Sequence, residues 1–323
     1  MKFVIIGTTE FDIECSKAIM DSQGSVSAMI SMPKHARPNN SADIADFANT
    51  RGVPYYEIED MNSPEGLTLL KSYSHDYLLV SWPQILTSEV LEIPGCFCIG
   101  THPTDLPFNR GRHPLHWLIA LGIKKSNVSF FRMEQGVDTG NVLIQVPFEI
   151  GPDDYIEDVV CKMNKAAYEG TKILYKILLA DHLCIGSEQN HISANYWRKR
   201  THHDVTIDLR MSSSMIIRTV RSFACPYPCA NLIFENYVIK IVRASPVSTE
   251  MTHEQIQRIE PGNIIFIVEN TIRVKVDDGI LDLECRDKIP DDVTKTKYIH
   301  PPSTYLAKWS VELSDKLSCN NKK

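Results

Sequence analysis

Positive charge and long apolar runs are both scarce in this sequence. Its 323 residues include 34 Lys and Arg against 40 Asp and Glu, which gives a formal net charge of -6. Proteins that bind nucleic acid through phosphates usually carry a basic surplus, so this balance argues against a nucleic-acid partner. The apolar run at 2–7 is too short for a signal-peptide core or a membrane span and is typical of a buried strand. We therefore expect a cytoplasmic protein without a membrane partner.

Familiar metal and nucleotide motifs are missing as well. The nine cysteines are scattered and form no Cys-x-x-Cys pair, which argues against structural zinc and favours a reduced compartment. Gly7 is followed by Thr8 and Thr9, so the first strand does not lead into a Gly-x-Gly-x-x-Gly loop. No P-loop, Gly-x-Ser-x-Gly or His-Glu-x-x-His motif occurs. We expect no bound metal, and the chemistry must come from another set of side chains.

Short apolar runs alternate with helical segments over the first half of the chain. This rhythm predicts an α/β fold with a Rossmann-like, mostly parallel sheet and helices on both of its faces. Ser41 is the expected N-cap of the second helix, and Asp153 or Asp154 opens the longest one. We expect strands at 2–7, 26–32, 53–58, 76–82 and 96–102, and helices at 11–22, 42–52, 64–73, 114–121 and 153–180.

The second half has a different pattern. Residues 186–206 are polar and rich in His, Arg and Lys, as in a connection between domains, and a helix is expected at 212–224. Apolar runs with turns at Glu235-Asn236 and Asp278-Gly279 then predict hairpins of a small, mainly antiparallel, OB-like domain. The predicted organisation is a catalytic domain at 1–185, a linker at 186–206, a C-terminal domain at 207–310 and a polar tail at 311–323.

Two residues are candidates for catalysis. His102 ends an apolar strand, and the ligand crevice of a parallel sheet lies outside the carboxyl ends of its strands. Asp138 lies between Gly136 and Gly140, in a loop whose backbone can approach a ligand closely. For either residue alone a structural role is at least as common, because a buried His often bonds a carbonyl and a loop Asp often forms an Asx turn.

Two basic segments suit the binding of phosphate. Arg110 and Arg112 flank a glycine, and guanidinium groups bind phosphates in a bidentate way. The run at 196–200, Tyr-Trp-Arg-Lys-Arg, places aromatic rings beside cations and suits a nucleotide base with its phosphates. Solvated turns and linkers have the same composition, so these assignments stay open at this point.

The order of these segments resembles one family. Residues 100–143, from GTHPTDLPFNRGR to GVDTGNVL, resemble the core of the formyltransferases that use 10-formyltetrahydrofolate. GTTEF at 7–11 and SWPQIL at 81–86 are similar to that family's first loop and to a folate-binding segment. The segment at 207–230 resembles the start of the second domain in methionyl-tRNA and sugar formyltransferases. The resemblance spans most of the chain.

The resemblance implies a role for each site residue. His102 would polarise the formyl carbonyl and stabilise the oxyanion, while Asp138 would hold His102 charged and assist proton removal from the attacking amine. Folate would be bound by Trp82, Gln84, Ile85, Leu86, Gln135, Gly136 and Val137, and the substrate by Thr8, Thr9, Phe11, Arg110, Arg112, Tyr196, Trp197, Arg198 and Lys199.

One position departs from the family pattern. The family has Asn two residues before the His, and this chain has Gly100. Loss of one oxyanion donor usually costs about 10²–10³ in rate. Either Asn109 or a water replaces that donor, or the protein is slow or inactive.

The acceptor amine is the least determined feature. The segment WRKR followed by IDLRMS resembles enzymes that formylate nucleotide-linked amino sugars, and a nucleoside diphosphate would engage the basic segments. We therefore predict a sugar N-formyltransferase that acts on an amino-dideoxy sugar for lipopolysaccharide or O-antigen synthesis, and relatives suggest a homodimer. The alternatives are a methionyl-tRNA formyltransferase, a non-catalytic folate- or nucleotide-binding relative and, more weakly, a 10-formyltetrahydrofolate hydrolase.

Overall fold

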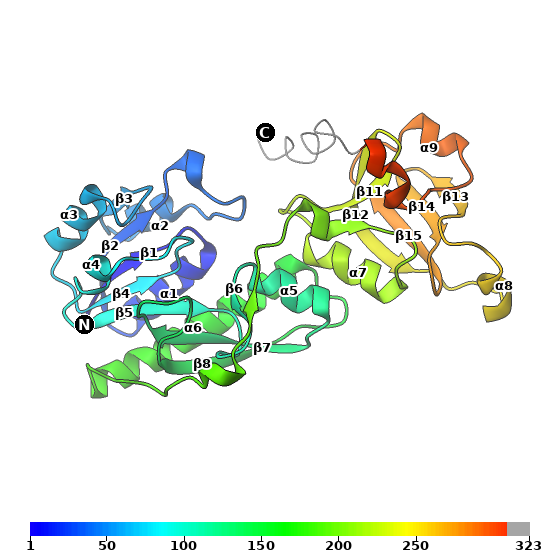
Figure 1. Ribbon diagram of the computed structural model, residues 1–323. Coiled ribbons are helices and arrows are strands. Elements are labelled where there is room, and N and C mark those ends of the chain that lie inside the picture. Colours follow the sequence, from blue (N-terminus) through cyan, green and yellow to red (C-terminus); the bar gives the residue numbers. More distant parts are fainter. Residues whose placement is uncertain (309–323) are drawn as a thin grey trace. The chain divides into compact units, whose positions relative to one another are not determined.

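The computed structural model describes residues 1–308 and divides the chain into two compact units (Figure 1). The first unit consists of Met1–Pro114, Lys125–Ile150 and Val159–Arg198. The second consists of Leu115–Lys124, Gly151–Asp158 and the chain from Lys199 onward. Two short segments of the first half thus pack with the second unit. Each unit is described below by itself.

A seven-stranded sheet forms the centre of the first unit. Its strand order is β3-β2-β1-β4-β5-β7-β8; the first five run parallel, and β7 and β8 are antiparallel to their neighbours. The predicted mostly parallel sheet is therefore confirmed, although β7 and β8 were not among the expected strands. The strands are β1 (Lys2–Ile6), β2 (Ser25–Ser31), β3 (Tyr55–Glu57), β4 (Tyr77–Val80), β5 (Phe97–His102), β7 (Lys125–Arg132) and β8 (Val142–Glu149).

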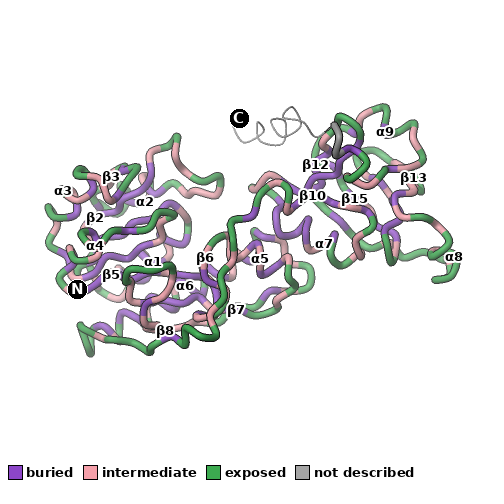
Figure 2. The backbone as a smooth tube through the Cα atoms, in the orientation of Figure 1, coloured by how far each residue is buried: buried purple, intermediate pink, exposed green. Residues whose placement is uncertain are grey.

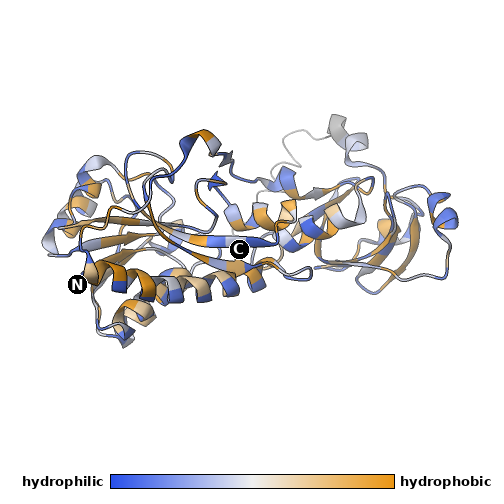
Figure 3. Cartoon of the chain, turned by 90° about the horizontal axis from the view of Figure 1, so that it is seen from below, coloured by the Kyte–Doolittle hydropathy of each residue, from blue (hydrophilic) through white to orange (hydrophobic). Residues whose placement is uncertain are grey.

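Helices cover both faces of this sheet, as predicted. One face packs Val4 of β1 and Leu78 of β4 with Leu70 of α3 and Val90 of α4 in one apolar cluster. The opposite face carries Phe3, whose ring lies 6.3 Å from that of Tyr175 in α6. Figure 2 shows that most of the strands are buried, and Figure 3 shows that they are mostly hydrophobic. The helices of this unit are α1 (Glu10–Asp21), α2 (Ile44–Thr50), α3 (Pro64–Ser72), α4 (Ser88–Leu91) and α6 (Ile156–Ala180), whereas α5 (Pro114–Leu121) lies almost wholly in the second unit.

Two predicted helix starts were wrong. Asp43, not Ser41, caps α2, because its carboxylate accepts the N–H of Asp46 at 3.0 Å. The Ser41 hydroxyl instead donates to the carbonyl of Pro38 at 2.7 Å. The longest helix begins at Ile156, since the Asp154 carboxylate is engaged by the N–H of Gly151 at 2.6 Å, in the turn before the helix.

The second unit contains a six-stranded sheet, ordered β10-β11-β12-β15-β14-β13. β10 pairs with β11 in parallel, and the other pairs are antiparallel, so the predicted mainly antiparallel domain is confirmed. Glu235-Asn236 joins β11 to β12 as predicted, and a second Glu-Asn turn, at 269–270, joins β13 to β14 in a hairpin that was not expected. The strands are β10 (Thr206–Ile207), β11 (Ala230–Phe234), β12 (Tyr237–Pro246), β13 (Ile264–Val268), β14 (Thr271–Lys275) and β15 (Ile280–Cys285).

Helix α7 (Ser213–Ser222) packs in the apolar core of this second sheet. The hydroxyl of Ser212 accepts the N–H of Met215 and caps the helix, which starts within the predicted range 212–224. Ile216 and Val220 of α7 join Ile241 of β12 and Leu283 of β15 in the apolar core of the unit. The shorter helices of the unit are α8 (His253–Gln257) and α9 (Asp291–Lys295).

The segment 186–206, predicted as a linker, contains ordered structure. Strand β9 (Tyr196–Trp197) pairs in parallel with β6 (Arg110–Gly111), and two 3-10 turns lie at His191–Ser193 and His202–Val205. Among the helices within 1–308, none is long and apolar enough to cross a membrane. The same residues contain no group of three or more His, Cys, Asp and Glu side chains arranged to hold a metal ion.

Candidate active site

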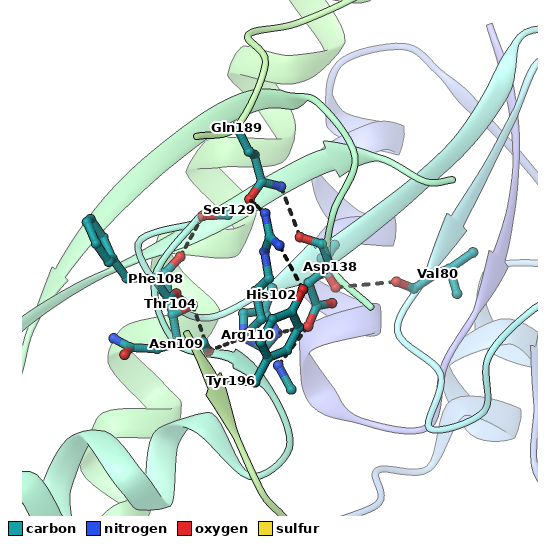
Figure 4. Close-up of polar contacts among 12 residues, drawn as sticks. Val80, His102, Thr104, Phe108, Asn109, Arg110, Ser129, Asp138, Gln189 and Tyr196 are labelled. Atoms are coloured by element: carbon teal, nitrogen blue, oxygen red, sulfur yellow. Dashed lines mark hydrogen bonds and ion pairs between the residues drawn. The ribbon is translucent and has the colours of Figure 1, made fainter. Parts of the chain in front are cut away.

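His102 lies at the carboxyl end of β5, where the sequence predicts a ligand crevice (Figure 4). The residue is only 5% exposed, so its contacts with the protein determine its orientation. Its Nε2 lies 2.9 Å from the backbone carbonyl oxygen of Asn109. Because a carbonyl only accepts hydrogen bonds, Nε2 carries a hydrogen and Nδ1 is the nitrogen left for chemistry.

Asp138 faces that second nitrogen. One of its carboxylate oxygens, Oδ2, lies 3.5 Å from His102 Nδ1, which is within ion-pair reach but longer than a good hydrogen bond. The same oxygen accepts the N–H of Gly111 at 2.9 Å. Asp138 has a φ of 55°, a conformation that few residues other than glycine adopt. The two predicted catalytic residues are thus brought together at one edge of the sheet.

The turn between β5 and β6 is fixed by hydrogen bonds from several elements. The Thr104 hydroxyl donates to the carbonyl of Phe108 at 2.9 Å, and the Gln145 amide of β8 donates to that of Leu106 at 3.0 Å. At Gly111 the φ is 103°, and a Cβ would overlap the carbonyl oxygen of Trp197, so only glycine fits beside β9. The turn therefore presents its backbone to His102 and Asp138 in one arrangement.

The place of the family's Asn is occupied by an aromatic ring. Gly100 of β5 pairs with Phe131 of β7, and a Cβ built on Gly100 would overlap the Phe131 ring. His102 shares this face of the strand, since alternate residues of a strand point the same way. Phe131 is 4% exposed. An apolar ring therefore stands where the resemblance implies a hydrogen-bond donor.

Asn109 offers His102 an acceptor. Its carbonyl bonds the imidazole, while its side-chain oxygen accepts from the amide of Asn195 at 3.1 Å. The Asn109 side chain points away from the imidazole in Figure 4. The predicted donor role would therefore require the amide to leave Asn195.

Family models match both parts of the chain. The model described as "Formyl transferase" matches residues 1–175, more than half of the sequence, and "Formyl transferase, C-terminal domain" matches 199–287. The chain belongs to the formyl transferase family. Two curated relatives of this formyl transferase are named methionyl-tRNA formyltransferase. The protein of Alkaliphilus oremlandii is 25% identical over 88% of this chain and 91% of its own length. The protein of Desulforamulus reducens is 27% identical over 86% of this chain and 87% of its own length.

Solved structures share the fold of this formyl transferase. The N-formyltransferase from Helicobacter canadensis, described in complex with folinic acid and dTDP-3-aminofucose, has a TM-score of 0.65 at 15% identity and covers 88% of this chain and 99% of its own. HypX from Aquifex aeolicus, in complex with tetrahydrofolic acid, has a TM-score of 0.64 at 11% identity. The match covers 88% of this chain and 43% of the HypX chain. The predicted family and enzyme class, a formyltransferase, are confirmed.

The predicted folate segments of this formyl transferase lie in two connected loops. The loop after β4 carries Ile85, which is 70% exposed, and the loop before β8 carries Val137, which is 39% exposed. A hydrogen bond from the Gln135 amide to the hydroxyl of Ser88, the first residue of α4, joins the second loop to the end of the first. Trp82 donates its indole N–H to the Gln84 side chain at 3.1 Å, and Leu86 is buried in the core. Val137 directly follows Gly136, and an exposed apolar side chain of this kind can pack against a flat ring.

The predicted substrate residues of the first loop are mostly engaged by the protein. Thr8 is buried, and Phe11 is buried with its ring stacked 6.5 Å from that of Phe130. Thr9 caps α1 through the Asp12 carboxylate, which accepts both its N–H, at 2.9 Å, and its hydroxyl, at 3.0 Å. In this arrangement Phe11 belongs to the core of the unit.

The predicted phosphate-binding residues differ sharply from one another. Arg112, Arg198 and Lys199 are exposed, and Trp197 is half-buried. Arg110 is 1% exposed, and its guanidinium bonds Tyr196, Gln189 and His191. Tyr196 itself is 57% exposed, so one face of its ring is open to a ligand. Arg110 therefore lies inside the protein in this formyl transferase.

Sequence reasoning missed several residues that contact the candidate site and its loops. Gln189 and Asn195 contact the backbone around the catalytic pair, and Asn62 bonds both the carbonyl of Ile85 and the N–H of Thr87. Each is an amide in a polar segment, a common residue type that carries no motif. Asp12 was missed too: it is fully buried beside Gly7, and burial raises its pKa to about 7.

Proposed function

We propose that this formyl transferase moves a formyl group from 10-formyltetrahydrofolate to the amine of a nucleotide-linked amino-dideoxy sugar. The observation that carries the proposal is the pairing of His102 and Asp138 at the carboxyl end of β5, in a chain of this family. The sugar is supported by the Helicobacter canadensis N-formyltransferase, whose structure is described with dTDP-3-aminofucose. The proposal includes a cytoplasmic homodimer that serves surface-polysaccharide synthesis.

In this proposal each step involves particular atoms. The donor, when bound, supplies an amide-like formyl group. His102 keeps its Nε2–H on the Asn109 carbonyl and uses Nδ1–H to donate to the formyl oxygen as the amine attacks. Asp138 accepts the proton of the attacking amine, directly or through a water. A new C–N bond forms, the bond to N10 of the folate breaks, and the proton ends on N10.

Direct assay tests the proposal. Purified protein is incubated with 10-formyltetrahydrofolate and a panel of nucleotide-linked amino sugars, and release of tetrahydrofolate is followed. We expect turnover with at least one sugar, and a loss of about 10³-fold or more in kcat for His102→Ala, because the ring is the oxyanion donor and also pairs with Asp138, the proton acceptor. Turnover with charged initiator tRNA and with no sugar would overturn the choice of substrate.

A methionyl-tRNA formyltransferase is the second candidate. It is favoured by the names of the curated relatives, at 25% and 27% identity. The net charge of -6 opposes it. Binding of tRNA through phosphates would weaken steeply with salt, so affinity for initiator tRNA measured from 50 to 200 mM salt separates the two candidates.

A non-catalytic binding protein is the third candidate, and Gly100 with the Phe131 ring favours it. Under this alternative, His102→Ala binds tetrahydrofolate or nucleotide as the wild type does, and the wild type transfers no formyl group to any acceptor. Measurable turnover by the wild type would exclude it.

A further inference from the structure

We propose that Arg110 and Gln189 are positioning residues that hold Asp138 beside His102, an inference that rests on the proposed role of Asp138. Gln189 is 4% exposed, and its Nε2 donates to the carbonyls of Asp138, at 2.9 Å, and Gly140, at 2.6 Å. Its Oε1 accepts from the Arg110 guanidinium at 2.7 Å. Figure 4 shows Gln189 between Arg110 and the Asp138 loop. We call this pair the Arg110–Gln189 brace.

The brace has only one orientation. A guanidinium only donates hydrogen bonds, so Oε1 of Gln189 must face Arg110. The two backbone carbonyls only accept, so Nε2 must face them. The amide of Gln189 therefore cannot flip without breaking all three bonds. A bridge of this kind defines a position more closely than a single hydrogen bond does.

The backbone around Arg110 contacts both members of the catalytic pair. The carbonyl of Asn109 accepts from His102, and the N–H of Gly111 donates to Asp138. The Arg110 side chain adds a third contact, because it donates to Gln189, which in turn donates to the Asp138 carbonyl. Residues 109–111 thus set the position of the imidazole, the carboxylate and the loop that carries the carboxylate.

Asp138 needs such support. At its φ of 55° a non-glycine residue is in a sparsely populated conformation, which persists only where the surroundings impose it. Its distance of 3.5 Å to His102 Nδ1 is already at the outer range for an ion pair. A small rotation of the loop would separate the two groups. Contacts with the Asp138 and Gly140 carbonyls are placed to prevent that rotation.

The burial of Arg110 is hard to explain by stability alone. Its side chain has no carboxylate partner among the described residues, and its acceptors are Gln189, Tyr196 and His191. Burial of a cation among neutral partners costs free energy. A hydrophobic pair at this place would serve the core better, whereas only a donor-rich group can orient the Gln189 amide.

Gln189→Met tests the brace, because it keeps the shape of the side chain and removes its hydrogen bonds. Asn231→Leu is the matched control: Asn231 is a buried amide of the second unit that donates to the His202 carbonyl at 3.1 Å and accepts from Lys240 at 2.6 Å. We expect Gln189→Met to lower kcat about 10²-fold with little change in KM for the donor. Asn231→Leu should lower Tm and leave kcat unchanged.

Spectroscopy separates the brace from the proposed function. With ¹⁵N-labelled His, the Nδ1 resonance of His102 should move in Gln189→Met, while Nε2, still bonded to the Asn109 carbonyl, should not. This readout needs no turnover, so a wild type without activity overturns the proposed function and leaves the brace testable. An unchanged Nδ1 resonance and kcat in folded Gln189→Met would overturn the brace, as would an equal loss of kcat in Asn231→Leu.

Arg110→Lys keeps the test valid if Gln189→Met does not fold. It retains the positive charge and loses the forked geometry that reaches both Gln189 and Tyr196. We expect a smaller loss of kcat than in Arg110→Met, together with a shift of the same Nδ1 resonance. Full activity in both Arg110 variants would overturn the proposal.

Discussion

Asp12 illustrates at the residue scale how burial alters an ordinary side chain. Its Oδ2 accepts from Thr9, while its Oδ1 is buried without a partner. Burial raises its pKa from 3.8 to about 7. The folded chain therefore holds this proton up to about pH 7, whereas the unfolded chain releases it near pH 3.8. Between these values the folded state binds more protons, so stability falls as pH rises.

Asp12→Asn should remove this pH dependence. The Asn side-chain oxygen can still accept from Thr9, and no charge has to be buried. The difference in free energy of unfolding between the variant and the wild type should grow in favour of the variant as pH rises from 4 to 7. By pH 8 this pH-dependent difference should be complete, at an amount on the order of 4 kcal/mol. Urea unfolding at several pH values measures the difference. Glu10→Gln, which changes an exposed carboxylate of the same helix, should leave the wild-type slope intact, and a parallel slope for Asp12→Asn would contradict the argument.

The same scale shows what residue identity can and cannot predict. The sequence predicts that His102 ends a strand and that Asp138 lies in a glycine-framed loop, because both are local features, and the structure brings the two side chains within 3.5 Å. It cannot show that Arg110 is buried and Arg112 exposed, since that depends on Tyr196 and Gln189, which lie 86 and 79 residues later. Contacts between distant segments decide which charge faces a ligand.

At the scale of elements, the pairing of β5 with β7 determines what stands beside His102. Gly100→Asn alone should be destabilised by about 1–3 kcal/mol, because its Cβ meets the Phe131 ring. Phe131→Ala alone leaves a cavity and should cost about 3–5 kcal/mol. Gly100→Asn with Phe131→Ala should cost less than the sum of the two, since each change accommodates the other. Urea unfolding of the three variants measures this, and strict additivity would show that the two positions do not share space.

Element prediction from sequence succeeds where local patterns are strong. The parallel strands are continuous apolar runs bounded by turns, and their positions were predicted within a few residues. β7 and β8 were missed because their sequences, KSNVSFFR and VLIQVPFE, mix polar residues and a proline into the strand. Their burial comes from pairing with β5 and with each other. The helix caps were misplaced because neighbouring Ser and Asp residues compete for the same turn.

At the scale of the whole molecule, the two units are not two continuous stretches of sequence, as the sequence predicts, because the second unit includes two segments from the first half of the chain. Helix α5 and the segment 151–158 pack with the second unit, although they precede most of it by many residues. The Arg221 side chain of α7 donates to the carbonyls of Asp154, at 2.6 Å, and Gly151, at 2.8 Å. His116 of α5 bonds the carbonyl of Ser222 at 2.6 Å, and its ring lies 4.4 Å from that of Tyr227.

An isolated fragment 199–308 should therefore be unstable. Without α5 and 151–158, the buried Arg221 loses both carbonyl acceptors, and the rings of Phe223 and Tyr227 lose the His116 ring. Each lost buried hydrogen bond costs about 1–3 kcal/mol, against a total stability of about 5–15 kcal/mol for a domain. Hydrogen exchange should show full protection of β12 and β15 in the whole chain and little in the fragment. Equal protection in both would mean that the second sheet folds without its N-terminal segments. In that case the predicted C-terminal domain, which begins at residue 207, would describe the folding unit better than the second unit with its two N-terminal segments does.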